Sequence, residues 1–204
     1  MESIIKETEL KYEKDALIDS NRGGNHTNRD ALIQGIKYIS RTRKNEDRVN
    51  ELVAYGATGI SSDPELGYQE MLFTQKQYKI NARKGKRVEH HIFGLGYEDK
   101  NERKLSDEQL TQFAKECSEE YYKMGFQNCY ALHREPSGEM HIHFMINSIQ
   151  FTTGLKFHEH WKARRERSYR FSDNLEAMRH KEYPTVPVCP IIFYDNSGRR
   201  LKNE

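Results

Sequence analysis

The sequence predicts an α+β domain in which an antiparallel sheet has helices packed on one face. Three observations support this class. Segments with strand character alternate with amphipathic segments along the chain, and two apolar runs around a Pro-Ser-Gly turn predict a β-hairpin. The 204 residues suffice for one core with appendages. We therefore expect one domain over 1–204, with flexible segments near 19–28 and 185–204.

The individual elements follow from hydrophobic periodicity and from cap and turn residues. Pro64 is suited to a first helical position, and Ser106-x-x-Gln109 has the pattern of a capping box. In order, the expected elements are an edge strand at 3–10, a helix from about 28 or 30 to 41, a strand at 52–60, a helix from 64 to about 78, a strand at 88–97, a helix from 106 to Gly125, the two hairpin strands and a helix from 172 to about 180.

The hairpin, within residues 129–149, carries the strongest chemical signal. Alternation with period two places one set of apolar side chains of its second strand on the core face, namely Met140, Ile142, Phe144 and Ile146. The other face carries His141 and His143, roughly 6.5–7 Å apart along the strand. His133 ends the partner strand, where the hairpin can bring it beside them.

Three neutral imidazoles on stiff β backbone form a site for a divalent metal with open coordination positions. A single histidine on a strand is usually solvated or hydrogen-bonded, and a His-x-His pair also arises by chance. The third histidine, with Glu135 and Glu139 nearby as orienting groups, favours the metal site. Imidazole ligands favour Mn²⁺ or Zn²⁺ by affinity, whereas Mg²⁺ prefers oxygen. We expect Mn²⁺ or Mg²⁺ in use, with Zn²⁺ as the alternative.

Segments 133–135 (His-Arg-Glu) and 141–148 (His-Ile-His-Phe-Met-Ile-Asn-Ser) resemble the three-histidine signature of conjugative and mobilization relaxases. These enzymes belong to the HUH endonuclease superfamily, named for two histidines around a hydrophobic residue. Segment 151–157 (Phe-Thr-Thr-Gly-Leu-Lys-Phe) is similar to the one that follows this strand in VirD2-type (MobP-type) relaxases. The resemblance implies a circularly permuted ferredoxin-like core.

The resemblance also implies roles for residues around the histidines. Glu135 occupies the position where the family usually has aspartate, so the resemblance implies a catalytic role for it. It also implies that Arg41 and Asn147 either support the metal ligands or contact DNA. His90 and His91 face opposite ways on their strand. We favour His91 for function because similar relaxases carry a histidine in the corresponding strand, although either one alone can be a packed, hydrogen-bonded residue.

Segment 35–41 (Gly-Ile-Lys-Tyr-Ile-Ser-Arg) resembles the one that carries the nucleophilic tyrosine in this group of relaxases. On the expected helix, Tyr38 lies off the centre of the apolar stripe. A phenol, with a pKa of about 10, is a poor nucleophile until its proton is removed or the attacked phosphate is polarised. The metal would polarise the attacked phosphate.

The resemblance implies metal-dependent, site- and strand-specific DNA nicking at an origin of transfer. The reaction forms a 5′-phosphotyrosine intermediate during plasmid or integrative-element mobilization. The implied partners are single-stranded DNA, accessory relaxosome proteins and a coupling protein. Two alternatives stay open: a rolling-circle replication initiator, for which Tyr169 would be the nucleophile, and a non-catalytic DNA-binding protein that contains a metal.

Composition excludes other classes of protein. No apolar run has the length of a membrane span and no signal-peptide core is present, so we expect a cytoplasmic protein without membrane insertion. The absence of a His-Glu-x-x-His motif argues against a metalloprotease.

The net charge is only +2, but basic residues gather at 37–44, 76–87, 162–170 and 199–202.

Overall fold

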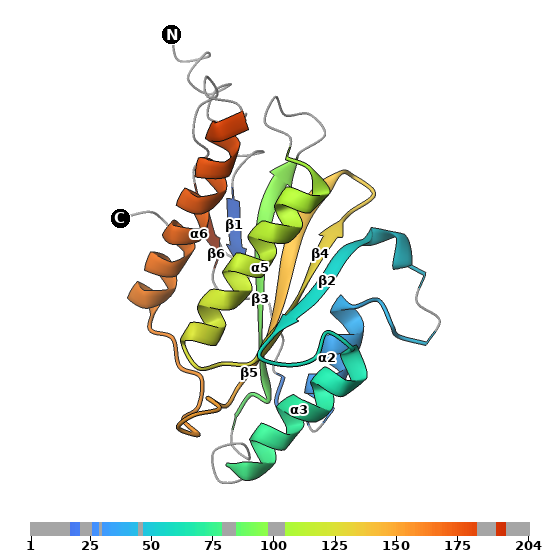
Figure 1. Ribbon diagram of the computed structural model, residues 1–204, viewed down its shortest axis with the longest axis vertical. Helices are drawn as coiled ribbons and strands as arrows, with labels where there is room; N and C mark the ends of the chain where they lie inside the picture. The colour runs from blue at the N-terminus through green and yellow to red at the C-terminus, as the bar shows by residue number, and fades with distance from the viewer. Residues whose placement is uncertain are drawn as a thin grey trace.

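The computed structural model describes residues 17–20, 26–28, 30–44, 47–78, 85–97, 105–182 and 191–194 (Figure 1). The elements are β1 (Leu17–Ser20), α2 (Ala31–Ile39), the 3-10 turn η1 (Val49–Glu51), β2 (Leu52–Thr58), α3 (Pro64–Gln77), β3 (Val88–Tyr97), α5 (Asp107–Lys123), β4 (Asn128–Arg134), β5 (Glu139–Asn147), α6 (Trp161–Glu182) and β6 (Ile191–Tyr194). The strand expected at 3–10 lies outside the described residues. Of the two segments expected to be flexible, 19–20 belong to β1 and 191–194 form β6.

The strands form one sheet in the order β2-β4-β5-β3-β1-β6, which confirms the α+β class. The pairs from β2 through to β1 are antiparallel, and β6 runs parallel to β1 at the edge. No described helix is both long and apolar enough to cross a membrane.

The structure differs from the expected architecture because helices cover both faces of the sheet. Helices α5 and α6 pack over one face and contribute to the larger apolar cluster, whereas α2 and α3 pack over the other. Strand β4 shows why both faces need cover: Leu132 is buried toward α5, and its neighbour Ala131 is buried toward α2. A strand that is apolar on both sides requires a layer on each.

The expected caps are confirmed. The Asp63 side chain accepts hydrogen bonds from two backbone N–H groups of the first turn of α3, and Pro64 is its first residue. Ser106 and Gln109 form a reciprocal capping box on α5. Gly125, with φ of 90°, follows the end of that helix.

Helix α6 begins at Trp161 rather than at Ser172, which lies buried inside it. The segment 162–170 is dominated by charged residues, so its sequence shows no apolar stripe from which a helix could be predicted. The buried side chains Phe171 and Leu175 attach the helix to the sheet.

Candidate active site

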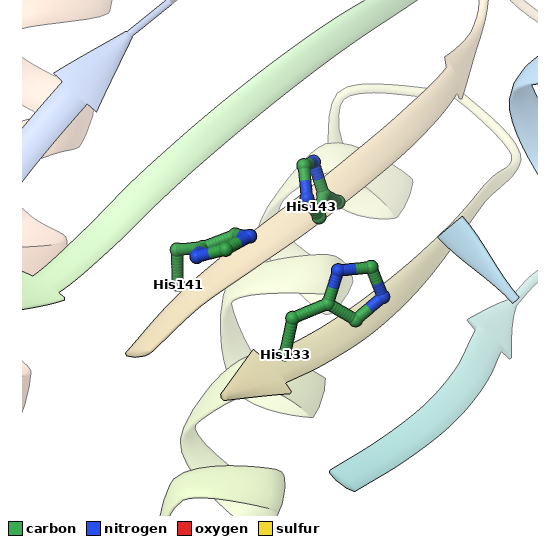
Figure 2. Close-up of side chains that lie close together, drawn as sticks. All are labelled: His133, His141 and His143. Carbon is green, nitrogen blue, oxygen red and sulfur yellow. The ribbon is translucent and has the colours of Figure 1, made fainter. Parts of the chain in front are cut away.

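The β4–β5 hairpin brings the three predicted histidines together (Figure 2). In the strand register His133 pairs with His141, and Ala131 pairs with His143. Residues directly opposite each other in an antiparallel pair project to the same face, so all three imidazoles lie on the face covered by α2. One ligand nitrogen from each ring lies within 4.8 Å of the other two. The predicted convergence is confirmed.

His133 is anchored to the last residue of α2. Its Nε2 lies 2.7 Å from the carbonyl oxygen of Ile39. A carbonyl only accepts hydrogen bonds, so Nε2 carries the proton and Nδ1 carries the lone pair of the neutral ring. Arg41 Nη2 donates to that Nδ1 over 3.2 Å. His133 and the helix that carries Tyr38 are therefore joined directly.

His143 makes its polar contact with another histidine. Its Nδ1 lies 2.8 Å from His90 Nε2, and the two rings are 5.0 Å apart. The other nitrogen, His143 Nε2, is buried and has no hydrogen-bond partner among the residues that the structure describes.

The choice of His91 over His90 is corrected by the structure. Strand β3 is antiparallel to β5 with His90 opposite Met145, which places His90 on the face of the triad. His91 projects to the opposite face, where its Nδ1 lies 3.0 Å from the Tyr121 hydroxyl and its ring packs against Phe157. Sequence alternation gives the two opposite orientations, but only the register with β5 decides which one reaches the site.

His141 is the most accessible of the three histidines. Its Nε2 lies 3.6 Å from Glu135 Oε1, a contact too long for a hydrogen bond. Glu135 occupies the turn of the hairpin, where its backbone N–H donates to the carbonyl oxygen of Glu139. The position of Glu135 fits an orienting group beside His141, and its catalytic role stays a prediction.

Burial keeps these imidazoles neutral. Desolvation is the main cause that lowers the pKa of His133 to about 3, and it likewise lowers the pKa of His141 to about 4, with the charge of Arg41 adding to the effect. Desolvation also lowers the pKa of His143 well below its usual value and that of His90 to about 3. At neutral pH no proton has to leave before these nitrogens can bind a metal.

The residues present fit a divalent metal ion. The lone pair on His143 Nε2 is buried without a partner among the described residues, which is the arrangement that a ligand atom requires. The lone pair on His133 Nδ1 accepts from Arg41 Nη2 in this structure and would bind a metal once that donor turns away. Its opposite nitrogen is fixed by a carbonyl in the way usual for metal-bound histidine. His133, His141 and His143 would hold the ion.

Tyr38 lies beside this cluster. Its half-buried ring is 5.6 Å from the ring of His143 and 6.2 Å from that of His90, both in edge-on contact. Three guanidinium groups surround the phenol ring, with carbon-to-centroid distances of 4.8 to 5.8 Å, from Arg41, Arg43 and Arg48. The placement of Tyr38 off the buried stripe of α2 agrees with the expectation.

Arg41 adopts a backbone conformation that is rare for its residue type. Its φ is 53°, at the position directly after the C-cap of α2 where glycine is usual, at a cost of about 1–2 kcal/mol. The side chain is buried and donates to Glu51 Oε2 over 2.5 Å. Arg41 Nε and Nη1 have no partner within the described part of the chain. The strained backbone thus directs a buried cation toward His133.

Asn147 does not contact the site. It is fully buried, and its side chain donates to the carbonyl oxygen of Met71 and accepts from Gln75, which ties β5 to α3. The expected contact of Asn147 with DNA is corrected to this structural role. Tyr169, the alternative nucleophile, lies on α6, which covers the face of the sheet opposite the triad, and its hydroxyl accepts from Arg165 Nε.

Several residues around Tyr38 could not be predicted from the sequence. Arg43 and Arg48 belong to or follow a basic cluster that gave no reason to prefer them. Glu51 ends a 3-10 turn before β2, and nothing in its sequence context indicates that Arg41 needs a buried partner. His90 could have been found only with the register of β3 on β5.

The family model for relaxases, described as MobA/VirD2-like, nuclease domain, matches residues 38–180. The match begins at Tyr38, includes all three histidines and covers well over half of the chain. A search of curated proteins returned no significant match. The triad, the adjacent tyrosine and the family match agree, and the chain belongs to the relaxase family with a MobA/VirD2-like nuclease domain.

Proposed function

We propose that the protein nicks one DNA strand at an origin of transfer in a metal-dependent reaction, with Tyr38 as the nucleophile. The observation that carries this proposal is the edge-on contact between the Tyr38 ring and the ring of His143. A nucleophile must lie beside the group that polarises the phosphate, because both act on the same phosphorus atom.

The reaction is a transesterification. The phenolic oxygen of Tyr38 forms a bond to the scissile phosphorus while the bond from phosphorus to the 3′ oxygen breaks. The phenol loses its proton, and the departing oxygen becomes a free 3′ hydroxyl. The protein is then joined to the 5′ phosphate, and reversal of the same step rejoins a strand. A divalent metal held by the triad would supply Lewis-acid stabilisation of the negative charge on the phosphoryl oxygens.

The arginines around Tyr38 support the binding of an anionic strand. Arg43 and Arg48 are exposed and lie within cation–π distance of the phenol, so they line the approach to it. Arg41 is buried and retains two donor nitrogens without partners among the described residues. Guanidinium groups bind phosphate oxygens through paired N–H donors, which suits them to hold the scissile phosphate near Tyr38.

The substrate and partners extend the family assignment. Single-stranded DNA at the origin of a plasmid or integrative element is the proposed substrate, because the scissile phosphate must reach the half-buried Tyr38 beside the histidines. Accessory relaxosome proteins and a coupling protein belong to the same proposal. The rival initiator reading would require Tyr169, which lies across the sheet from the triad.

The test uses labelled single-stranded oligonucleotides tiled across the DNA that flanks the gene, with Mn²⁺ or with EDTA. We expect one cleavage position on one strand, dependent on metal, and lost in Tyr38→Phe. Tyr169→Phe is the matched control and should nick at the wild-type rate. Wild-type cleavage in EDTA, or retention of cleavage by Tyr38→Phe, would contradict the proposal.

A further inference from the structure

His90 occupies a position that the proposed reaction does not use. It lies on β3, next to β5, and is almost completely buried on the face of the triad. Its Nε2 faces His143 Nδ1 at 2.8 Å, within a direct hydrogen bond. Since each neutral imidazole carries one proton on one of two nitrogens, this contact constrains both rings.

The direction of the hydrogen bond follows from the other nitrogen of His143. His143 Nε2 is buried without a hydrogen-bond partner among the described residues. A proton on Nε2 would leave a buried donor unsatisfied and would remove the lone pair that a metal needs. The proton therefore belongs on Nδ1, from which it is donated to His90. His90 Nε2 must accept, so His90 carries its own proton on Nδ1.

We propose that His90 is a positioning residue that accepts the Nδ1–H of His143, and so fixes the tautomer and ring orientation with which His143 binds metal. This inference rests on the metal site of the proposed function. Metal-bound histidines usually donate their second N–H to a carboxylate, a backbone carbonyl or water. Here the neutral imidazole of His90 accepts the hydrogen bond from His143, and the Ile39 carbonyl accepts the hydrogen bond from His133.

The choice of neutral acceptors has an electrostatic consequence. A carboxylate behind a ligand would make that imidazole more basic and would offset part of the charge of the metal. Neither His90 nor the carbonyl of Ile39 adds a negative charge to the two buried ligands, so more of the positive charge is available to a phosphate.

The experiment compares three variants by titration of the metal-free protein with Mn²⁺ in a calorimeter. His90→Gln places an amide oxygen near the position of Nε2 and should bind within a few-fold of wild type. His90→Leu offers no acceptor and should bind about 10- to 100-fold more weakly. His91→Leu is the matched control, because it removes an adjacent buried histidine from the opposite face, and its folded form should bind as wild type does.

Nitrogen NMR of the imidazoles gives a readout that stability alone does not change. In metal-free wild type, His143 should be protonated on Nδ1, and in His90→Leu this preference should be lost. A proton on His143 Nε2 of wild type would overturn the inference without any variant, even if His90→Leu does not fold. Equal affinities of His90→Leu and wild type would also overturn it. If wild type binds neither Mn²⁺ nor Zn²⁺, the metal-dependent function fails, while the tautomer still reports separately on the His90 contact.

Discussion

The two faces of the sheet are built from the same strands but differ in chemistry. Toward α5 and α6, strand β5 presents Ile142 and Phe144, which join an extended apolar cluster. Toward α2, the alternate residues of the same strand are His141 and His143, and the apolar cluster on that face is smaller. The face toward α5 and α6 carries the larger apolar cluster, and the face toward α2 carries the histidines of the candidate site.

This difference explains how a small domain holds several buried imidazoles at fixed positions. Adjacent residues of β5 belong alternately to the apolar core and to the histidine cluster, because successive side chains in a strand project to opposite faces. The backbone that carries His141 and His143 is therefore held in place by the core residues between and beside them. The comparison predicts that substitutions of neighbouring residues separate function from stability.

The largest expected effect concerns a ligand on the site face. His143→Ala removes one of the three proposed metal ligands and the contact with Tyr38, so metal-dependent nicking should fall by roughly 10³-fold, equivalent to about 4 kcal/mol of transition-state stabilisation. The measurement is the single-turnover nicking rate with Mn²⁺, accompanied by a thermal melt to confirm folding. If a folded His143→Ala protein nicks at the wild-type rate, the triad is not needed for the reaction.

Its neighbour on the core face should behave in the opposite way. Phe144 is buried against Tyr121 and Phe171, so Phe144→Ala should lower the free energy of unfolding by about 4 kcal/mol through lost burial and a cavity. Urea denaturation measures this loss. The fraction that remains folded should keep the metal affinity of wild type, and a large loss of affinity would show that the two faces are not separable.

A third substitution tests the buried ion pair at the end of α2. Arg41→Met leaves the Glu51 carboxylate buried without its main partner, at an expected cost of about 3 kcal/mol of stability, with Arg48 at 3.9 Å compensating in part. The double variant Arg41→Met/Glu51→Met should recover much of this loss in urea denaturation. If both variants have the stability of wild type, the buried Arg41–Glu51 ion pair does not contribute to the stability of the fold.

The smallest effect, counted per pH unit, is the dependence of stability on pH. The folded-state pKa values of His133 and His141 lie near 3 and 4, below the ordinary value of about 6.5 that holds in the unfolded chain. Their contribution to stability is complete above pH 6.5 and declines as the pH falls toward 4, by up to about 1.4 kcal/mol per pH unit for each histidine.

Urea denaturation of the metal-free protein at several pH values between 7.5 and 4.5 measures this slope. His141→Ala removes one of the titrating imidazoles and should have a shallower slope than wild type. A stability that is constant between pH 7 and 5 would show that these histidines are not buried in their neutral form.

The features that could be predicted from the sequence are those that local pattern determines. The hairpin, the convergence of His133 with His141, and the capping box at Ser106 depend on residues near one another in the chain. Tyr38 needed the resemblance to relaxases as well, because periodicity only placed it off the buried stripe.

The remaining features depend on tertiary contacts that a sequence does not display. The role of His90 depends on the register between β3 and β5, and the burial of Asn147 depends on where α3 packs. The left-handed backbone of Arg41 gives no signal, since the residue usual at that position is glycine. The early start of α6 lacks the apolar periodicity from which helices are predicted.

The most direct test of the account is the identity of the residue joined to DNA. Wild-type protein is incubated with Mn²⁺ and a single-stranded substrate, the covalent adduct is isolated under denaturing conditions, and peptide mass spectrometry locates the phosphate. We predict a 5′-phosphoryl linkage on Tyr38, which lies on the face of the triad. A linkage on Tyr169, which lies across the sheet, or on a histidine would contradict it.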